Sequence, residues 1–415
     1  MLTKFGLKEI KRNRLLYSLT IVLLTVIFVI LTFAITVTVK STKKYSAIRK
    51  IMDSEYGYCL RTNQLVNPDN NVFIKNKKEL QEVIGASLYA AGQYRITGAL
   101  VNGELADVWS YDRELLDAYT PNIIAGRWFQ EKDFAQENKL YGVAVSDGSI
   151  QVGDTVEVMD WTEESAIDVE IIGLIKDGSS VMGNDEFREA AHDYTDFYYT
   201  YSTVGEEKSL LILSNDQLDR CDNVESMETE ESSAIARQQC GLLFVTWETE
   251  EDRYKLEDFI SVAGLGMPII WESVGEIQIG SEKAIKAQLY NILPIVVCSL
   301  ILVLLVTISV GTVSVKQQLH NYAIYSLCGL SRKRCVFISM TASLCCVVLA
   351  FIVSHVGMLF AGWKGWLEDT AVEISLYTVG GCMVIWIIYI GISMLIPSII
   401  IKNKTIKSLL ITHRE

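Results

Sequence analysis

The side chains that most often carry out catalysis or bind metals are few and scattered in this sequence. Its four histidines lie far apart and lack the spacing of a zinc site: His192, His320, His355 and His413. The chain contains neither a Gly-x-x-x-x-Gly-Lys-Ser/Thr loop to cradle phosphates nor a Gly-x-Ser-x-Gly nucleophile turn. Carboxylates are abundant, and we interpret them as a solvated surface rather than as catalytic pairs. We therefore expect a non-enzymatic chain with no metal and no cofactor.

Long apolar segments, each free of charged residues, occupy much of the 415-residue chain. They cover residues 15–39, 287–315, 335–363 and 374–401. About 20 apolar residues cross the hydrocarbon core as a helix, so each segment is long enough to span a membrane. The first segment is too long for a cleaved signal peptide, and no small-x-small cleavage site follows it before Lys40. The sequence thus predicts four transmembrane helices.

The net charge of −13 is distributed unevenly along the chain. Residues 40–286 hold 45 acidic and 23 basic residues, whereas the remainder holds 5 acidic and 14 basic residues. The remaining basic residues cluster before the first segment, between the second and third, and after the fourth, as cytoplasmic loops do. This predicts cytoplasmic termini and an extracytoplasmic domain, and it outweighs an opposing basic patch at residues 40–50.

The acidic balance of the outer domain limits its possible partners. Nucleic acid and anionic lipid headgroups carry negative charge, so both would be repelled by this domain. We expect no nucleic-acid partner, and we keep a cationic peptide or a protein as a possible extracytoplasmic ligand.

The predicted fold class is an α-helical membrane protein with four transmembrane helices and a large extracytoplasmic α+β domain between helices 1 and 2. The predicted segments are a basic amphipathic segment 1–14, transmembrane helix 15–39, outer domain 40–286 with stalk helices, transmembrane helix 287–315, cytoplasmic coupling segment 316–334, transmembrane helix 335–363, outer loop 364–373, transmembrane helix 374–401 and cytoplasmic tail 402–415.

The outer domain shows a mixture of strand and helix patterns. Residues 141–145, 155–159, 169–175 and 241–247 are rich in apolar residues and lie between turn signals, which predicts strands. Residues 249–263 predict a helix, because Thr249 is a suitable N-cap before three acidic residues and an apolar stripe. An extended segment is expected again at residues 268–271.

Three further features of the outer domain are an acidic, tyrosine-rich segment, two segments beside the spans and a pair of cysteines. We interpret the Asp-, Glu- and Tyr-rich residues 179–207, with a helical patch at 187–191, as a mobile insertion rather than a recognition loop. Residues 42–52 and 275–287 adjoin the first two spans without a strong helix breaker, so we expect two stalk helices that continue these spans. A bridge between Cys221 and Cys240 stays open, because the sequence does not decide it.

Polar and small residues inside the spans have simple interpretations. We expect His355 to donate to a helix carbonyl rather than to serve a transport path. Gly380 and Gly381 would allow close helix approach, and Pro294 would bend the second span near its outer end.

The order of one span, an outer domain and three further spans resembles the FtsX-like/MacB-like permeases, also called mechanotransmitting or type VII ABC permeases. Three local stretches carry the resemblance. They are Ala125-Gly126-Arg127-Trp128-Phe129 with Asp133 and the later Gly153-Asp154 turn, Ile324-Tyr325-Ser326-Leu327-Cys328-Gly329-Leu330-Ser331-Arg332, and Ile396-Pro397 before a basic tail.

The resemblance implies an ABC ATPase as a separate partner chain and a homodimer or heterodimer of permeases in a lipid bilayer. It implies a short helix at about residues 321–328 that seats in the ATPase, with the coupling residues Asn321, Tyr322, Ile324, Tyr325, Leu327, Gly329, Ser331 and Arg332. We interpret Gly126, Arg127, Trp128, Phe129, Gly153 and Asp154 as structural turns of the outer-domain core. The chain departs from the family at Asn321, where an acidic residue is common.

The expected function is that of a permease subunit in the cell membrane, which transmits ATP-driven motion to its outer domain. The cargo would be a peptide, a lipoprotein or a lipid-like substrate that is exported or extracted. One alternative is an FtsX-like signalling permease that activates an extracytoplasmic cell-wall hydrolase. A second alternative is a membrane-anchored receptor without an ATPase.

Overall fold

The structure is a computed structural model of the whole chain. It describes residues 8–51, 57–62, 65–67, 69, 72–74, 77–96, 98–135, 139–145, 149–159, 166–183, 191–201, 210–221, 224–225, 235–263, 269–363 and 376–402.

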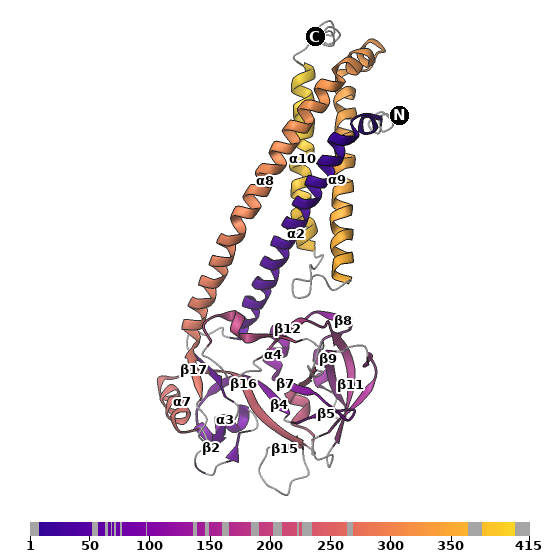
Figure 1. Cartoon of the computed structure of the whole chain (residues 1–415). Helices are drawn as coiled ribbons and strands as arrows, with labels where there is room; N and C mark the ends of the chain where they lie inside the picture. The colour runs from indigo at the N-terminus through magenta and orange to yellow at the C-terminus, as the bar shows by residue number, and fades with distance from the viewer. Residues whose placement is uncertain are drawn as a thin grey trace. The chain divides into compact units, whose positions relative to one another are not determined.

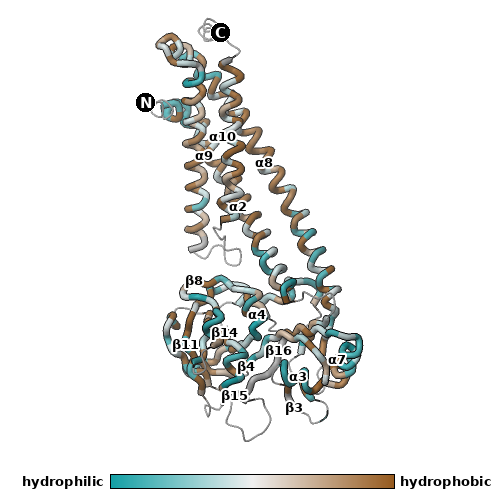
Figure 2. Tube along the Cα trace, turned by 180° about the vertical axis from the view of Figure 1, so that it is seen from behind, coloured by the Kyte–Doolittle hydropathy of each residue, from teal (hydrophilic) through white to brown (hydrophobic). Residues whose placement is uncertain are grey.

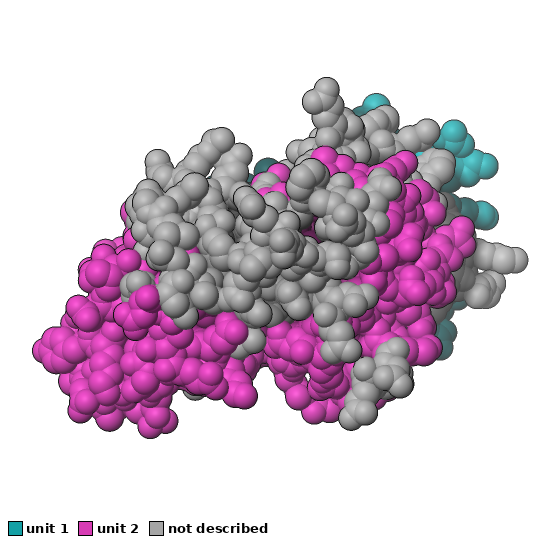
Figure 3. Space-filling view, turned by 90° about the horizontal axis from the view of Figure 1, so that it is seen from below, with its two compact units in different colours: residues 1–40, 286–415 teal, residues 41–285 magenta. Residues whose placement is uncertain are grey.

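The chain forms two compact units, which Figure 3 shows in different colours. Unit 1 contains residues 1–40 and 286–415, and unit 2 contains residues 41–285. Two helices contribute residues to both units: α2, Arg14–Ile51, and α8, Val274–Leu327. The large domain therefore lies between the first and second apolar segments of the chain, as expected.

Unit 1 is built from long helices, which are α2, α8, α9 (Arg332–Trp363) and α10 (Leu376–Lys402) (Figure 1). All four are long and apolar enough to cross a membrane, by length and composition. Figure 2 shows hydrophobic residues along these helices. Their shared core contains Leu24, Phe28, Val303, Val347 and Cys382, which come from all four helices. The prediction of four long apolar helices is confirmed.

Packing in unit 1 explains two of the noted residues. A Cβ on Gly381 would overlap the Ile35 side chain, so this glycine lets α10 approach α2 closely, whereas Gly380 faces open space. His355 Nδ1 lies 3.0 Å from the Phe351 carbonyl oxygen, one turn earlier on α9. The local hydrogen bond expected for His355 is thus present. Pro294 lies inside α8, which continues past it.

Unit 2 is a mixed sheet with short helices. Its strands are β1 Gly57–Arg61, β2 Val66–Asn67, β3 Val72–Phe73, β4 Leu88–Ile96, β5 Leu100–Val101, β6 Glu104–Leu105, β7 Asp107–Tyr111, β8 Ile123–Gly126, β9 Leu140–Val145, β10 Thr155–Met159, β11 Ala166–Ile175, β12 Ser179–Met182, β13 Tyr198–Tyr201, β14 Leu210–Ser214, β15 Val224–Glu225, β16 Ile235–Trp247 and β17 Ile270–Ser273. Its helices are α3 Lys77–Ile84, α4 Arg113–Ala118, α5 Glu131–Phe134, α6 Asn215–Leu218, the 3-10 helix η1 Tyr194–Phe197, and α7 Glu250–Val262.

The main sheet runs in the order β17-β1-β16-β4-β7-β14-β9-β11-β10-β5-β6, with β15 beside β16 and β8 beside β11. Most neighbouring strands are antiparallel, whereas β7–β14, β9–β11 and β15–β16 are parallel. The buried apolar side chains of unit 2 form three clusters, and sheet residues contribute to each of them. This is the large sheet-and-helix domain that the sequence predicts.

The strands and the helix expected in the outer domain are present. The predicted strands correspond to β9, β10, β11 and β16, and the predicted helix corresponds to α7. The Thr249 hydroxyl accepts from the backbone N–H of Asp252 at 3.2 Å, as an N-cap does. The later extended segment becomes β17, which pairs with β1.

The interpretation of residues 179–207 as a mobile insertion is wrong for the described part of that segment. Residues 179–182 and 198–201 form the two-stranded ribbon β12–β13, and Phe197 between them is fully buried. Aromatic and apolar residues of the ribbon pack into the core of unit 2, which explains its order. The helical patch expected at residues 187–191 lies largely outside the described residues.

Candidate functional site

The ends of α2 and α8 that belong to unit 2 form part of its hydrophobic core. Ala47, Ile48 and Ile51 of α2 are buried there, together with Val274 and Ile277 of α8. Each fully buried aliphatic side chain stabilises such a contact by about 1.5–3 kcal/mol. Helices α2 and α8 therefore continue beyond the apolar segments, and their ends in unit 2 are anchored in its core.

The ribbon β12–β13 binds the outer end of α2 through Lys44. The Lys44 ammonium donates to Ser180 Oγ of β12 at 2.8 Å. The Tyr198 hydroxyl of β13 donates to the Lys44 carbonyl oxygen at 2.8 Å, and Lys44 Nζ lies 4.9 Å from the centre of the Tyr198 ring. One lysine of α2 thus contacts both strands of the ribbon through its side chain and its backbone.

The segment that leads into the ribbon also touches both helices. The ring of Tyr194 in η1 lies edge-on to Tyr45 of α2, with centroids 6.1 Å apart. On α8, Gly280 faces the carbonyl oxygen of His192 so closely that a Cβ at this position would overlap it. Glycine at residue 280 therefore permits a close backbone approach. The chain from His192 through η1 to the ribbon β12–β13 thus contacts the unit 2 ends of both α2 and α8.

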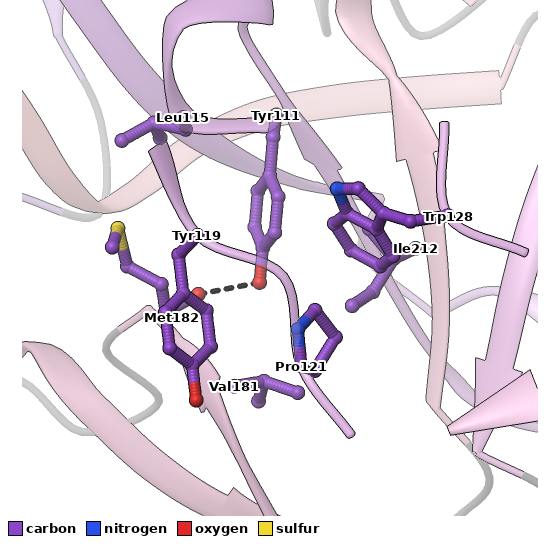
Figure 4. A pocket seen from close by; sticks show the side chains of 8 residues that line it. All are labelled: Tyr111, Leu115, Tyr119, Pro121, Trp128, Val181, Met182 and Ile212. Carbon is purple, nitrogen blue, oxygen red and sulfur yellow. Dashed lines mark hydrogen bonds between the residues drawn. The ribbon is translucent and has the colours of Figure 1, made fainter. Parts of the chain in front are cut away.

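Beyond the ribbon lies an apolar pocket, which is shown in Figure 4. It is lined by Tyr111, Leu115, Tyr119, Pro121, Trp128, Val181, Met182 and Ile212. It has no room for a water molecule, so it is a packing seam rather than a ligand cavity. Across it, the Tyr111 hydroxyl donates to the Met182 carbonyl oxygen, and the Tyr119 hydroxyl donates to the Ser180 carbonyl oxygen at 3.2 Å.

The expected turn at residues 126–129 has a structural explanation. Gly126 has a positive φ of 70°, and a Cβ there would overlap the Ile172 carbonyl oxygen of β11. The Arg127 guanidinium donates to both oxygens of Asp133, at 2.5 and 2.7 Å. The Trp128 indole N–H donates to the Leu116 carbonyl oxygen at 2.8 Å. This turn joins α4, α5 and β11, and the Trp128 ring lines the pocket.

The second turn, at Gly153 and Asp154, is also held by β11. Gly153 has a φ of 95°, and its N–H donates to the Ile171 carbonyl oxygen at 2.8 Å. The Asp154 carboxylate accepts from the Gln151 N–H at 2.8 Å. A left-handed backbone at this position favours glycine.

Two buried carboxylates of unit 2 have pKa values shifted in opposite directions. Burial raises the pKa of Asp112 to about 6, and hydrogen bonds from Asn215 and Gly92 and the charge of Lys77 only partly oppose it. Burial also raises the pKa of Asp133, but the hydrogen bonds from Arg127 and Gln130 outweigh it, so the net pKa is lowered.

At the other end of α8, the helix continues to Leu327 without interruption. Residues 321–327 are helical, as expected, but they are the last turns of the long helix α8 rather than a short helix. Gly329 ends the helix with a φ of 89°, and its N–H donates to the Ser326 carbonyl oxygen at 3.1 Å. The Leu330 N–H donates to the Tyr325 carbonyl oxygen at 2.9 Å, which completes a Schellman motif.

The candidate coupling residues divide into an exposed and a buried group. Ile324 and Leu327 are 41% and 64% exposed, and large apolar side chains at this spacing share one helix face. Tyr322 is buried in a cluster with Leu319 and Cys335, so it is held inside unit 1. Ser331 precedes α9, and its carbonyl oxygen accepts from the Cys335 N–H at 3.3 Å.

Four coupling candidates remain, namely Asn321, Tyr325, Gly329, which follows the end of α8, and Arg332, which begins α9. With its amide oxygen turned toward Arg12, Asn321 accepts from Arg12 Nη2 at 2.7 Å. The Tyr325 ring lies 6.5 Å from the Tyr322 ring, centroid to centroid. Arg12 and the nearby Glu9 are not among the predicted coupling residues, although Glu9 is the single acidic residue in the first 40 positions.

The last features to consider are possible metal ligands and the cysteine at residue 221. Within it, no group of three or more His, Cys, Asp or Glu residues is arranged to hold a metal ion. Cys221 Sγ donates to the Gln217 carbonyl oxygen at 3.5 Å. The side chain of Cys240 lies outside the described residues, so the bridge between Cys221 and Cys240 stays a prediction.

No family model matches this sequence, and no curated protein matches it. Among solved structures, the chain is similar to the crystal structure of the periplasmic region of MacB from Actinobacillus actinomycetemcomitans. The two are 12% identical, the match covers 58% of this chain and 98% of that chain, and the TM-score is 0.27.

Proposed function

We propose that this chain is the permease subunit of an ABC complex in the cell membrane, in which a separate ATPase drives movement of an extracytoplasmic domain. In this proposal the four apolar helices span the bilayer, both termini are cytoplasmic, and unit 2 is outside the cell. Two copies, or this chain and a related one, form the membrane dimer. The chain itself is not an enzyme.

The observation that carries the proposal is the 54-residue helix α8. One end of α8 is anchored in the core of unit 2 by Val274 and Ile277. Its other end exposes Ile324 and Leu327 just before the Gly329 turn. A single continuous helix with one end in a folded domain and an apolar face at the other suits the transfer of movement from a partner to that domain.

The ribbon β12–β13 and the residues before it would receive this movement in unit 2. Lys44 of α2 contacts β12, and Gly280 of α8 lies against the His192 carbonyl oxygen, two residues before η1. Strand β12 contacts Tyr111 and Tyr119 across the packing seam. Displacement of α2 or α8 would therefore be transmitted to the sheet through this ribbon. We propose that the resulting change in unit 2 exports or extracts a peptide, a lipoprotein or a lipid-like molecule.

The test first purifies the full chain from its own cell membrane, where we expect an ABC ATPase chain to co-purify, and then adds that ATPase to the permease in lipid nanodiscs. We expect the permease to bind this ATPase and to change its rate of ATP hydrolysis. Leu327→Glu should reduce binding at least about tenfold, because it places a charge in an apolar contact. Gly329→Val should also weaken coupling, because a β-branched residue resists a φ of 89°.

Gly329→Asn is the matched control, since asparagine tolerates the left-handed region far better than valine does. It should retain most of the binding. If the wild-type permease neither binds the ATPase nor alters its hydrolysis rate, the proposal is wrong. Capture of a cell-wall hydrolase by unit 2, without any transported molecule, would instead favour a signalling permease.

A further inference from the structure

A carboxylate is buried where the N-terminal segment of unit 1 meets α8. Glu9 lies in a helical stretch, residues 8–12, and is 3% exposed. Its neighbours Lys8, Lys11 and Arg12 are exposed, so Glu9 alone of these four charged residues faces inward. Burying an ionisable group costs free energy unless its bonds are satisfied, and this position therefore requires an explanation.

The partners of Glu9 are hydroxyl groups from two long helices. Its Oε1 accepts from the Tyr17 hydroxyl of α2 at 3.0 Å and from the Ser314 hydroxyl of α8 at 2.8 Å. Its Oε2 accepts from the Tyr322 hydroxyl of α8 at 3.4 Å. Tyr17 and Ser314 also lie 2.7 Å apart, oxygen to oxygen. The Glu9 carboxylate thus forms hydrogen bonds that join the N-terminal segment to both α2 and α8.

The network contacts the end of α8 that also carries the candidate coupling face, formed by Ile324 and Leu327. Ser314 and Tyr322 are eight residues apart and so lie on one face of the helix. Arg12 adds a further bond to Asn321, beside Tyr322. Ile324 and Leu327 follow within five residues but belong to a different face, which is exposed. The N-terminal segment therefore contacts one side of α8, and the coupling face remains exposed.

We propose that Glu9 is a positioning residue that fixes the last turns of α8, so that Ile324 and Leu327 are presented to the ATPase in one orientation. Directional hydrogen bonds to Ser314 and Tyr322 resist rotation or sliding of α8 against the N-terminal segment, which an apolar contact would permit at lower cost. The inference rests on the proposed function for its consequence, but the contact itself is independent of any partner.

The first measurement uses the permease alone in nanodiscs. Amide hydrogen exchange of residues 318–327 is compared between the wild type, Glu9→Gln and Lys11→Gln, a control that also changes one charge of the same segment but is exposed. Loss of charge-assisted bonds should speed exchange in Glu9→Gln at least about tenfold, with no change in Lys11→Gln. Tyr322→Phe, which removes one donor, should shift exchange in the same direction.

The second measurement titrates the co-purified ABC ATPase into each permease. In Glu9→Gln, the ATPase concentration for half-maximal stimulation should rise about tenfold while the maximal rate is retained, because α8 must be oriented before binding. A loss of folded permease would instead lower the maximal rate and leave the half-maximal concentration unchanged.

The two measurements separate this inference from the proposed function. If the wild type does not engage the ATPase, the proposed function fails, and the exchange data still decide whether Glu9 holds α8. If the wild type engages the ATPase but Glu9→Gln matches it in both exchange and titration, the role of Glu9 is refuted and the proposed function stands.

Discussion

Replacing Asp112 with asparagine should change how the stability of unit 2 depends on pH. Asp112 follows β7 and is almost fully buried. Its Oδ2 accepts from the Gly92 N–H at 2.8 Å, and its Oδ1 accepts from the Asn215 amide at 2.9 Å. Even so, burial raises its pKa from 3.8 to about 6.

The sign and size of the effect follow from proton binding. The folded state keeps the Asp112 proton up to about pH 6, whereas an unfolded chain releases it near pH 3.8. The folded state therefore loses stability as the pH rises through this window, and the contribution of Asp112 is most favourable below it. A pKa difference of about two corresponds to about 3 kcal/mol in the free energy of unfolding.

The assay is amide hydrogen exchange of β4 and β7 in the full chain, corrected for the intrinsic pH dependence of exchange. Between pH 4 and pH 7, the opening free energy of the wild type should fall by about 2 kcal/mol relative to Asp112→Asn, because part of the full effect lies below pH 4. Comparing the change with pH removes any constant cost of the asparagine itself. Asp117→Asn, an exposed carboxylate on α4, is the control and should follow the wild type. Parallel profiles for the wild type and Asp112→Asn would refute the reasoning.

Two further substitutions test other contacts of unit 2. Gly280→Ala should destabilise η1 and β13 by about 1–3 kcal/mol, measured by local hydrogen exchange, because its Cβ overlaps the His192 carbonyl oxygen. Gly357→Ala, which meets open space on α9, should only stabilise its helix, and equal behaviour of the two variants would contradict the close approach. Asp133→Asn should cost about 2 kcal/mol at neutral pH and remove a loss of stability that the wild type shows as the pH falls below 3.8, since the pKa of Asp133 is lowered. A denaturant titration that shows the same acid limb in both proteins would disprove this.

Hydropathy and local turn signals were sufficient to predict the long helices and many strands. The four apolar segments predict the long helices because their length and composition leave few alternatives. Thr249 and the acidic residues after it predict the start of α7 for a local reason, namely the unpaired N–H groups of a first helical turn. Such signals depend only on neighbours in sequence.

The contacts that form the candidate site were not predictable in this way. Lys44 and Ser180 are 136 positions apart, and Glu9 and Ser314 are 305 apart. A periodic pattern shows which face of an element is buried, but it does not identify the partner of that face. The same limit explains the error for β12–β13. Its polar and aromatic residues predicted a surface insertion, whereas the structure shows that they contact α2.

The two ends of α8 differ in the kind of contact they make, and this difference bears on how the chain would work. At the outer end, Val274 and Ile277 are held by apolar packing, which is strong but tolerates small shifts because it has no direction. At the other end, Ser314 and Tyr322 are held by hydrogen bonds to one carboxylate, which specify an orientation. A helix that must be presented to a partner at one defined angle needs the second kind of contact there. A helix that must move a folded domain while staying attached to it needs the first kind at its opposite end.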